Sequence, residues 1–170
     1  MQPGALIDIA NIAVETASLG ISIEQFTITP YDVNASGYLA IMAQQTVMVT
    51  DTVTPLAQAL LSTGTIDFGV VRGGSVQQQA IGIINDGPSG AEALDASIGT
   101  ITGAGLGTGS FTLLAVGQTS TAIAVGLDTS GAGVVGGTVA IEPPSDGANT
   151  DGLGASALLL QDVTVSGTVC

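Results

Sequence analysis

The sequence predicts an all-β protein built as an antiparallel β-sandwich. Apolar residues alternate with small or polar residues in several short segments, which places one side of each segment in a core. Clusters of Gly, Pro, Asn, Asp and Ser, the residues of tight turns, separate these segments. One strand also occurs twice, as QTVMVTDTV at Gln45–Val53 and as QDVTVSGTV at Gln161–Val169. Many short strands at this spacing are typical of a sandwich of the immunoglobulin-like kind.

The repeated strand predicts the domain organisation. Its two copies are 161 − 45 = 116 residues apart, Phe26–Pro30 matches Val139–Pro143 at 139 − 26 = 113, and Ile12–Val14 matches Ile123–Val125 at 123 − 12 = 111. We therefore expect residues 1–53 to be the C-terminal half of a preceding β-sandwich repeat and residues 54–170 to be a complete immunoglobulin-like repeat. Pro55, which cannot donate a ladder hydrogen bond, suits the linker between them.

In the partial unit, Ala5–Val14 is predicted as a strand, although Leu6, Ile9 and Ala13 also lie at helical spacing. Further along, the apolar side changes between Ile21 and Ile23 on one hand and Phe26 and Ile28 on the other. One extra residue reverses which side chains face a core, so the change predicts a β-bulge near Glu24 or Gln25.

In the complete unit, five segments read as strands, with Phe68, Val125, Val139 and Val165 as predicted core residues: Thr65–Val70, Val76–Ile84, Ala122–Leu127, Val135–Ile141 and Asp162–Val169. Two short segments keep a helical alternative, Leu56–Leu61 and Ala155–Leu160, the latter as a helical turn before Leu160. The glycine-rich stretch Gly103–Gly109 is expected to be a flexible loop, because no βαβ pattern surrounds it as a dinucleotide site would need.

Composition excludes several classes of function. The chain of 170 residues carries 14 acidic residues against one Lys or Arg, no His, and a formal net charge of −13. Nucleic-acid binding needs clustered basic residues, and anionic membrane surfaces repel such a chain. No apolar run approaches the length of a membrane helix, and the N-terminus has no basic region of a signal peptide. The lone Cys170 permits no intrachain disulfide.

Five ordered segments carry a resemblance to a known family. They are Ile66–Gly74 (IDFGVVRGG), Ile81–Gly87 (IGIINDG), Leu94–Ser97 (LDAS), Val125–Thr129 (VGLDT) and the ending from Ser145-Asp146-Gly147 to Val165–Val169 (VSGTV). In this order they resemble the bacterial choice-of-anchor D domains over roughly residues 63–170. The resemblance implies an immunoglobulin-like surface repeat of an exported bacterial protein, extracellular or on the cell surface, whose signal and anchor lie outside this sequence. It implies no catalytic residues. Asp51 departs from the glycine found at Gly167.

One loop carries candidate metal ligands. Asp146, Asn149 and Asp151 place three oxygen-bearing side chains in the glycine-rich segment Asp146–Gly152, and such oxygens are the ligands that Ca²⁺ prefers. The spacing does not fit an EF-hand, and Asp and Asn are also ordinary turn residues. A calcium site and a plain loop both remain open, and no other cofactor is expected.

Catalysis is not expected. Asp67-Phe68-Gly69 has the letters of the kinase magnesium motif, but the chain lacks the lysine and histidine that a kinase needs. The absence of His excludes nucleophilic triads, and only carboxylates such as Glu15, Glu24, Glu92 and Glu142 remain for glycoside hydrolysis, without the aromatic residues that usually bind sugars.

The sequence therefore favours a non-catalytic structural or spacer repeat of an exported bacterial surface or secreted protein. The alternative is an acidic, adhesin-like binding module for calcium or a protein partner. Expected partners are neighbouring repeats of the same array and a protein that adds a strand to an open sheet edge of residues 1–53.

Overall fold

The computed structural model describes residues 12–14, 16–33 and 35–170, which include fifteen β-strands and no helix. The chain divides into two compact units, residues 1–53 and residues 54–170. No helix in the described part of the chain is long and apolar enough to cross a membrane.

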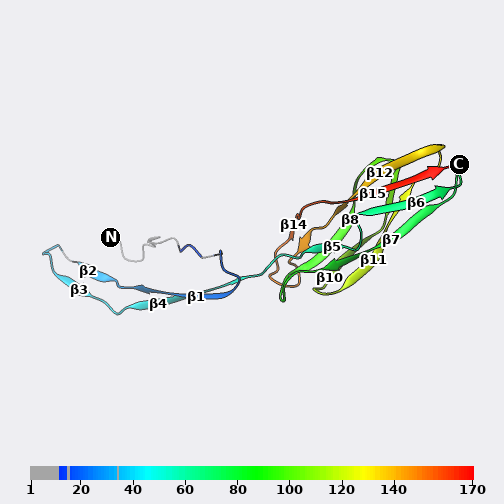
Figure 1. Cartoon of the computed structure of the whole chain (residues 1–170). Helices are drawn as coiled ribbons and strands as arrows, with labels where there is room; N and C mark the ends of the chain where they lie inside the picture. Colours follow the sequence, from blue (N-terminus) through cyan, green and yellow to red (C-terminus); the bar gives the residue numbers. More distant parts are fainter. Residues whose placement is uncertain (1–11, 15, 34) are drawn as a thin grey trace. The chain divides into compact units, whose positions relative to one another are not determined.

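The larger sheet of the second unit has the strand order β14-β13-β8-β12-β15-β6, and β10 also pairs with β8. Its strands are β6 (Thr65–Val71), β8 (Ala93–Gly103), β10 (Ser110–Leu114), β12 (Gly133–Glu142), β13 (Ser145–Asp146), β14 (Ala155–Ser156) and β15 (Gln161–Val169) (Figure 1). Neighbouring strands are antiparallel except β6, which lies parallel to β15. The predicted antiparallel sheet thus has one parallel edge strand.

The second sheet has four strands in the order β5-β7-β11-β9. They are β5 (Ala59–Leu61), β7 (Gln77–Asn85), β9 (Gly105–Thr108) and β11 (Thr119–Leu127), all antiparallel. Side chains from both sheets form one core, and those fully shielded from solvent are Ile81, Ile83, Leu94, Ile123, Val125, Val139, Ile141, Val163 and Val165. Two sheets that share one core confirm the predicted β-sandwich.

Phe68 is only half-buried, in contrast to the predicted core residues Val125, Val139 and Val165. A bulge in β6 explains the difference, because the pairing steps from Ser166 opposite Asp67 to Thr168 opposite Val70. Gly69 has φ +67°, and its N–H donates a 3.0 Å hydrogen bond to Oδ1 of Asp67. Asp67-Phe68-Gly69 is therefore a bulged strand segment, in which glycine supplies the left-handed conformation.

Two helical alternatives are not realised, and two local predictions are wrong. Leu56–Leu61 and Ala155–Leu160 contain no helix, since Ala59–Leu61 is β5 and Ala155–Ser156 is β14. Gly103–Gly109 is no loop, because β8 ends at Gly103 and Gly105–Thr108 forms β9 beside β11. Ile12–Val14 lies in no strand, and most of the rest of Ala5–Val14 is outside the described residues.

The first unit contains a two-stranded ribbon, Gly20–Val53, made of two pairs of strands in succession. β1 (Gly20–Ile28) pairs with β4 (Gln45–Val53), and β2 (Tyr31–Val33) pairs with β3 (Leu39–Ile41), both antiparallel (Figure 1). A hydrogen bond of 2.9 Å from Met42 N to Pro30 O joins the two pairs. The β1–β4 register runs without a shift, so the predicted bulge near Glu24 or Gln25 is wrong. Ile21 and Ile23 simply lie on the opposite side of β1 from Phe26 and Ile28.

The ribbon repeats the pairing of β12–β15 and of β13–β14 in the sandwich. Gly20 pairs with Val53 as Gly133 pairs with Val169, so β1 corresponds to β12 at 133 − 20 = 113 and β4 to β15 at 169 − 53 = 116. The same two offsets carry the pair Asp32–Ala40 onto Ser145–Ser156. The connecting loops differ by three residues, 34–38 against 147–154, which accounts for the difference between the offsets.

In the sandwich, β12 and β15 are flanked by other strands. β8 pairs with β12 on one side, and β6 pairs with β15 on the other. Within the described residues, β1 and β4 pair only with each other. The ribbon is thus the structural counterpart of the central strand pair of the sandwich, with both outer edges free of strand partners among those residues.

Candidate functional site

A buried polar network binds the first residues of the second unit to its large sheet. Ala57 N donates a 2.8 Å hydrogen bond to Oγ of Ser145, and that hydroxyl donates a 2.6 Å hydrogen bond to Oε2 of Glu92. Glu92 N in turn donates to the carbonyl of Pro55 at 3.0 Å. Ser145 and Glu92 are both buried. Burial of a carboxyl costs much less free energy when the group accepts a strong hydrogen bond than when it has no partner.

Asn85, the last residue of β7, completes this network from the second sheet. Its side chain is fully buried. The amide Nδ2 donates to the carbonyls of Glu92 and Leu114, each at 3.0 Å. Oδ1 accepts from Gln58 N at 3.3 Å and from Gly87 N at 3.2 Å. One buried side chain therefore makes hydrogen bonds to four backbone groups. Asn85 directly follows the predicted strand Val76–Ile84, and this position at the end of an apolar strand is the signal that could have indicated its burial.

The predicted calcium loop lies next to this network. Oδ1 of Asp146 accepts a 2.8 Å hydrogen bond from Ala148 N, and Oδ1 of Asp151 accepts one of 2.9 Å from Leu153 N. Oδ2 of Asp151 accepts a further bond of 2.8 Å from the hydroxyl of Thr54. Asn149 is exposed on the loop. The two aspartates thus act as turn residues, each bonding to a backbone amide two positions later.

The loop closes on the carbonyl of Gly147, which accepts hydrogen bonds from Thr150 N, Asp151 N and Gly152 N at 2.9–3.1 Å. A side chain at Gly147 would collide with Oδ1 of Asp151 and approach Oε1 of Glu92 at 3.1 Å. The carboxyls of Glu92 and Asp151 therefore both lie beside Gly147. Glu92, which the sequence analysis did not assign to this loop, therefore contributes the second carboxyl beside Asp151.

Hydrogen bonds hold the pKa of the Asp151 carboxyl below its ordinary value. The largest cause is the backbone N–H of Leu153, followed by the hydroxyl of Thr54, while partial desolvation acts in the opposite direction. Asp151 is therefore a carboxylate at neutral pH. Among the described residues, no three or more acidic or Cys side chains converge as a metal-binding group.

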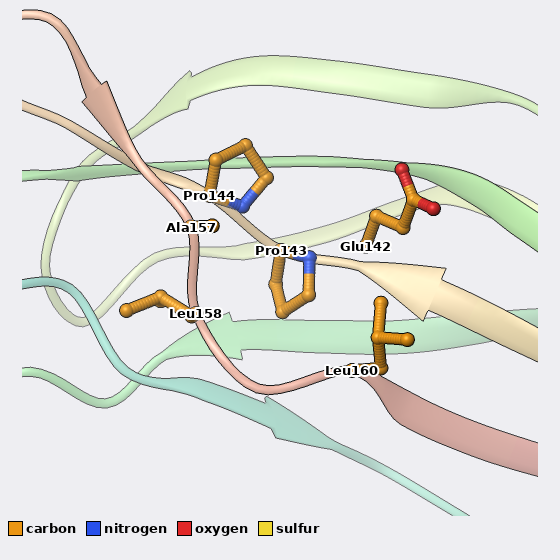
Figure 2. Close-up of a pocket in the computed structure, with 6 residues that line it drawn as sticks. All are labelled: Glu142, Pro143, Pro144, Ala157, Leu158 and Leu160. Carbon is orange, nitrogen blue, oxygen red and sulfur yellow. The ribbon is translucent and has the colours of Figure 1, made fainter.

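A separate apolar hollow of about 370 Å³ lies beside the segment that connects β14 to β15 (Figure 2). Glu142, Pro143 and Pro144 line it from the end of β12, and Ala157, Leu158 and Leu160 line it from the connecting segment. A second hollow of about 260 Å³ shares Pro143 and Leu158. Leu160 lines the first hollow and Leu159 the second, and both side chains are exposed. The surface here is apolar and shallow, with one carboxylate and no second group for acid–base chemistry.

Within the sandwich, the candidate carboxylates Glu92 and Glu142 do not form a catalytic pair that a substrate could reach. Glu142 folds over Gly99 of β8, Glu24 lies on the ribbon, and Glu15 is outside the described residues. Glu92 does approach Asp151, but its side chain is 4% exposed and bonded to Ser145. Hydrolysis of a glycoside needs two carboxyls that both reach the sugar.

No family model and no curated protein matches the chain. Among solved structures, the chain is similar to the ASH/PapD-like domain of human CEP192 (PapD-like domain 7), at 13% identity and a TM-score of 0.49, over 71% of this chain and 90% of that one. It is also similar to a protein of unknown function from Porphyromonas gingivalis W83, at 17% identity and a TM-score of 0.45, over 91% of this chain and 68% of that one. Both scores are below 0.5, so neither likeness carries an argument about function.

Proposed function

We propose that the chain is a non-catalytic structural repeat, a spacer in an exported bacterial surface or secreted protein that resembles the choice-of-anchor D domains. The register match between the Gly20–Val53 ribbon and Gly133–Val169 carries this proposal. Two copies of one strand pattern in a single chain are the mark of an array, in which each unit is a rigid module. Residues 1–53 are then the C-terminal half of a preceding repeat.

The network around Asn85, Glu92 and Ser145 supports the same proposal. It attaches Pro55 and Ala57, which directly follow the ribbon, to both sheets of the sandwich. A spacer needs modules that are rigid in themselves, and the network holds the first residues of the complete unit to its own core. The net charge of −13 keeps an apolar, glycine-rich surface soluble.

Export can be tested on intact cells that produce the full-length protein. A protease that cuts after acidic residues, added outside the cells, should release peptides from residues 54–170 that mass spectrometry identifies. Recovery of these peptides only after lysis would contradict the proposal. A cytoplasmic protein of the same cells is the control for leakage.

The meeting of Glu92 and Asp151 at Gly147 favours one second candidate, the acidic binding module with calcium as ligand. Two carboxyls and the hydroxyl of Thr54 offer oxygen ligands of the kind that Ca²⁺ takes, together with the predicted Asp146 and Asn149. Titration calorimetry with CaCl₂ separates the two candidates, since a spacer gives no saturable heat.

A further inference from the structure

The two outer faces of the sandwich differ in charge. Strands β5, β7, β9 and β11 of the four-stranded sheet contain no Asp, Glu, Lys or Arg. The outer face of the larger sheet carries carboxylates, among them Asp67, Asp95, Glu142 and Asp162. Each of these directly adjoins a buried core residue in the sequence, and successive residues of a strand project from opposite sides. One outer face is therefore acidic, and the other, here called the neutral face, is uncharged.

The register of the four strands defines the neutral face. Residues directly opposite each other in neighbouring strands project from the same side of a sheet. Three such rows cross the neutral face: Leu60, Ile84 and Thr119; Ala80, Ala124 and Thr108; and Gln78, Gly126 and Leu106. Ile83 and Val125, which adjoin two of these rows in the sequence, are fully buried, so the rows lie on the outer side. The middle row has small side chains, so another flat surface can approach the sheet closely.

The neutral face carries both a hollow and a projecting apolar side chain. A hollow of about 190 Å³ lies at one end of the face, lined by Leu60, Leu61, Ser62, Gly82, Ile84 and Thr119. Gly82 has no side chain to fill it. At the opposite end, in the last row, Leu106 is 43% exposed. The face is therefore complementary to a second copy of itself that is turned end to end, with Leu106 of each copy in the hollow of the other.

Charge also favours this face for contact between two copies. Each copy carries a formal net charge of −13, so two copies repel each other in most orientations. Contact through the neutral faces stacks four sheets and leaves the acidic faces outermost, roughly 30 Å apart at about 10 Å per sheet spacing. This separation exceeds the Debye length of about 8 Å in physiological salt severalfold, so the repulsion is screened. Asp86 and Asp128, which directly follow β7 and β11, are exposed at the rim of the neutral face.

The size of the neutral face indicates a weak interface. β7 and β11 have nine residues each and are flanked by the short strands β5 and β9. Strand spacing and rise give such a face an area on the order of 500 Å². Two copies then bury on the order of 1,000 Å² in total, which lies in the range of transient contacts.

We propose, beyond the proposed repeat function, that the neutral face binds the neutral face of a second copy of this chain. Leu106 of each copy enters the hollow beside Gly82 of the other, and the middle rows with Ala80 and Ala124 meet at the centre. The contact uses the side of the sandwich, so it joins two copies side by side.

Sedimentation velocity of the full chain tests the association, over a range from about 10 µM to about 1 mM that covers a weak interface. The average mass should rise toward that of a dimer, and added salt should strengthen the association because it screens the repulsion between the copies. The amide signals that shift with concentration should belong to β5, β7, β9 and β11. A monomer throughout this range, or shifts confined to other strands, would overturn the proposal.

Variants on the two faces identify the interface. Ala80→Asp places a charge at the centre of the contact and should raise the dissociation constant at least about tenfold. Thr164→Asp adds the same charge on β15, at an exposed position of the acidic face, and should have little effect. An equal loss in both variants, or no loss in Ala80→Asp, would show that the neutral face is not the contact. Urea unfolding verifies that each variant is folded.

A mixture of oppositely charged variants separates a contact at this face from the effect of net charge. Ala80→Lys mixed with Ala80→Asp should associate more tightly than Ala80→Asp alone, because the two new charges face each other across the interface. The matched mixture of Thr164→Lys with Thr164→Asp should show no such gain. Equal gains in both mixtures would contradict the proposal. All of these measurements use the purified chain, so their outcome is independent of export, which the cell-surface proteolysis measures separately.

Discussion

The side-chain amide of Asn85 donates a 3.0 Å hydrogen bond to the backbone carbonyl of Glu92, seven residues later and across the turn that leaves β7. The bond joins the end of β7, in the second sheet, to the residue that directly precedes β8 of the larger sheet. It is one of four bonds made by a single buried side chain, so its loss should have a large effect.

Asn85→Ala should destabilise the second unit by about 3 kcal/mol or more, because it leaves several buried backbone groups unsatisfied at once. Urea unfolding of the purified chain measures the change. The control is Asp86→Ala, at an exposed neighbouring position, which should change the free energy of unfolding by less than about 0.5 kcal/mol. A similar loss for both variants would contradict the role of Asn85.

Asn85→Asp should be destabilising in a pH-dependent manner. A carboxylate at this position would face the carbonyls of Glu92 and Leu114, so the folded state should raise its pKa above the unfolded value. The variant should therefore be most stable, relative to the parent, below the unfolded pKa of about 4, and should lose that stability as the pH rises through the folded pKa. A loss of stability that is the same at pH 3.5 and pH 7 would show that the carbonyls do not control this site.

Thr54→Val should raise the pKa of Asp151 toward its ordinary value, because it removes the hydroxyl that donates to Oδ2. The pKa should still remain lowered, since Leu153 N–H is the larger cause. In the parent chain this carboxylate stabilises the folded state above the unfolded pKa, and the contribution is lost as the pH falls through the lowered folded pKa. Carboxyl ¹³C NMR measures the titration. Thr150→Val, in the same loop but bonded to Gly147, is the control and should leave the pKa of Asp151 unchanged.

Titration with CaCl₂ should give no saturable heat, because the Oδ1 atoms of Asp146 and Asp151 already accept hydrogen bonds from backbone amides. A saturable heat that Asp151→Asn abolishes would instead support the calcium alternative. Asp128→Asn is the matched control, since Asp128 is bonded to Ser130 in a different turn.

Hydrogen exchange should separate the two copies of the repeated strand. Val47 and Val163 occupy equivalent positions, but Val47 is partly exposed and Val163 is fully buried. Amides of β1 and β4 should therefore exchange well before those of β12 and β15. Equal protection in a dilute monomer would mean that residues 1–53 form a closed domain of their own.

The sequence was sufficient to predict the sandwich and most strands of its core. The reason is that β-branched residues alternate with small or polar ones around Ile123, Val125, Val139, Val163 and Val165, all of which are buried. It was insufficient where a single backbone conformation decides the result. Gly69 changes the direction of Phe68 through a bulge, and Gly105–Thr108 forms a strand because β11 offers it an edge, neither of which the local pattern shows.

The candidate site was predicted only in part for a similar reason. Asp146 and Asp151 are neighbours in the sequence, and the loop could be recognised from their spacing. Glu92 and Thr54 reach the same loop from 59 and 97 residues away (151 − 92 and 151 − 54), through pairings that only the folded chain defines.

The two strand pairs have the same register although their connecting loops contain five and eight residues, at 34–38 and 147–154. The number of residues in this hairpin loop therefore does not affect the register of the strands that the loop connects. In evolution, the tip can gain or lose residues without a compensating change elsewhere, so new surface chemistry can arise there while the scaffold stays the same. For protein engineering, the exposed Gly154 is accordingly the position in this tip at which an epitope or a labelling sequence can be inserted, because Gly147 and Asp151 hold the rest of the loop in place.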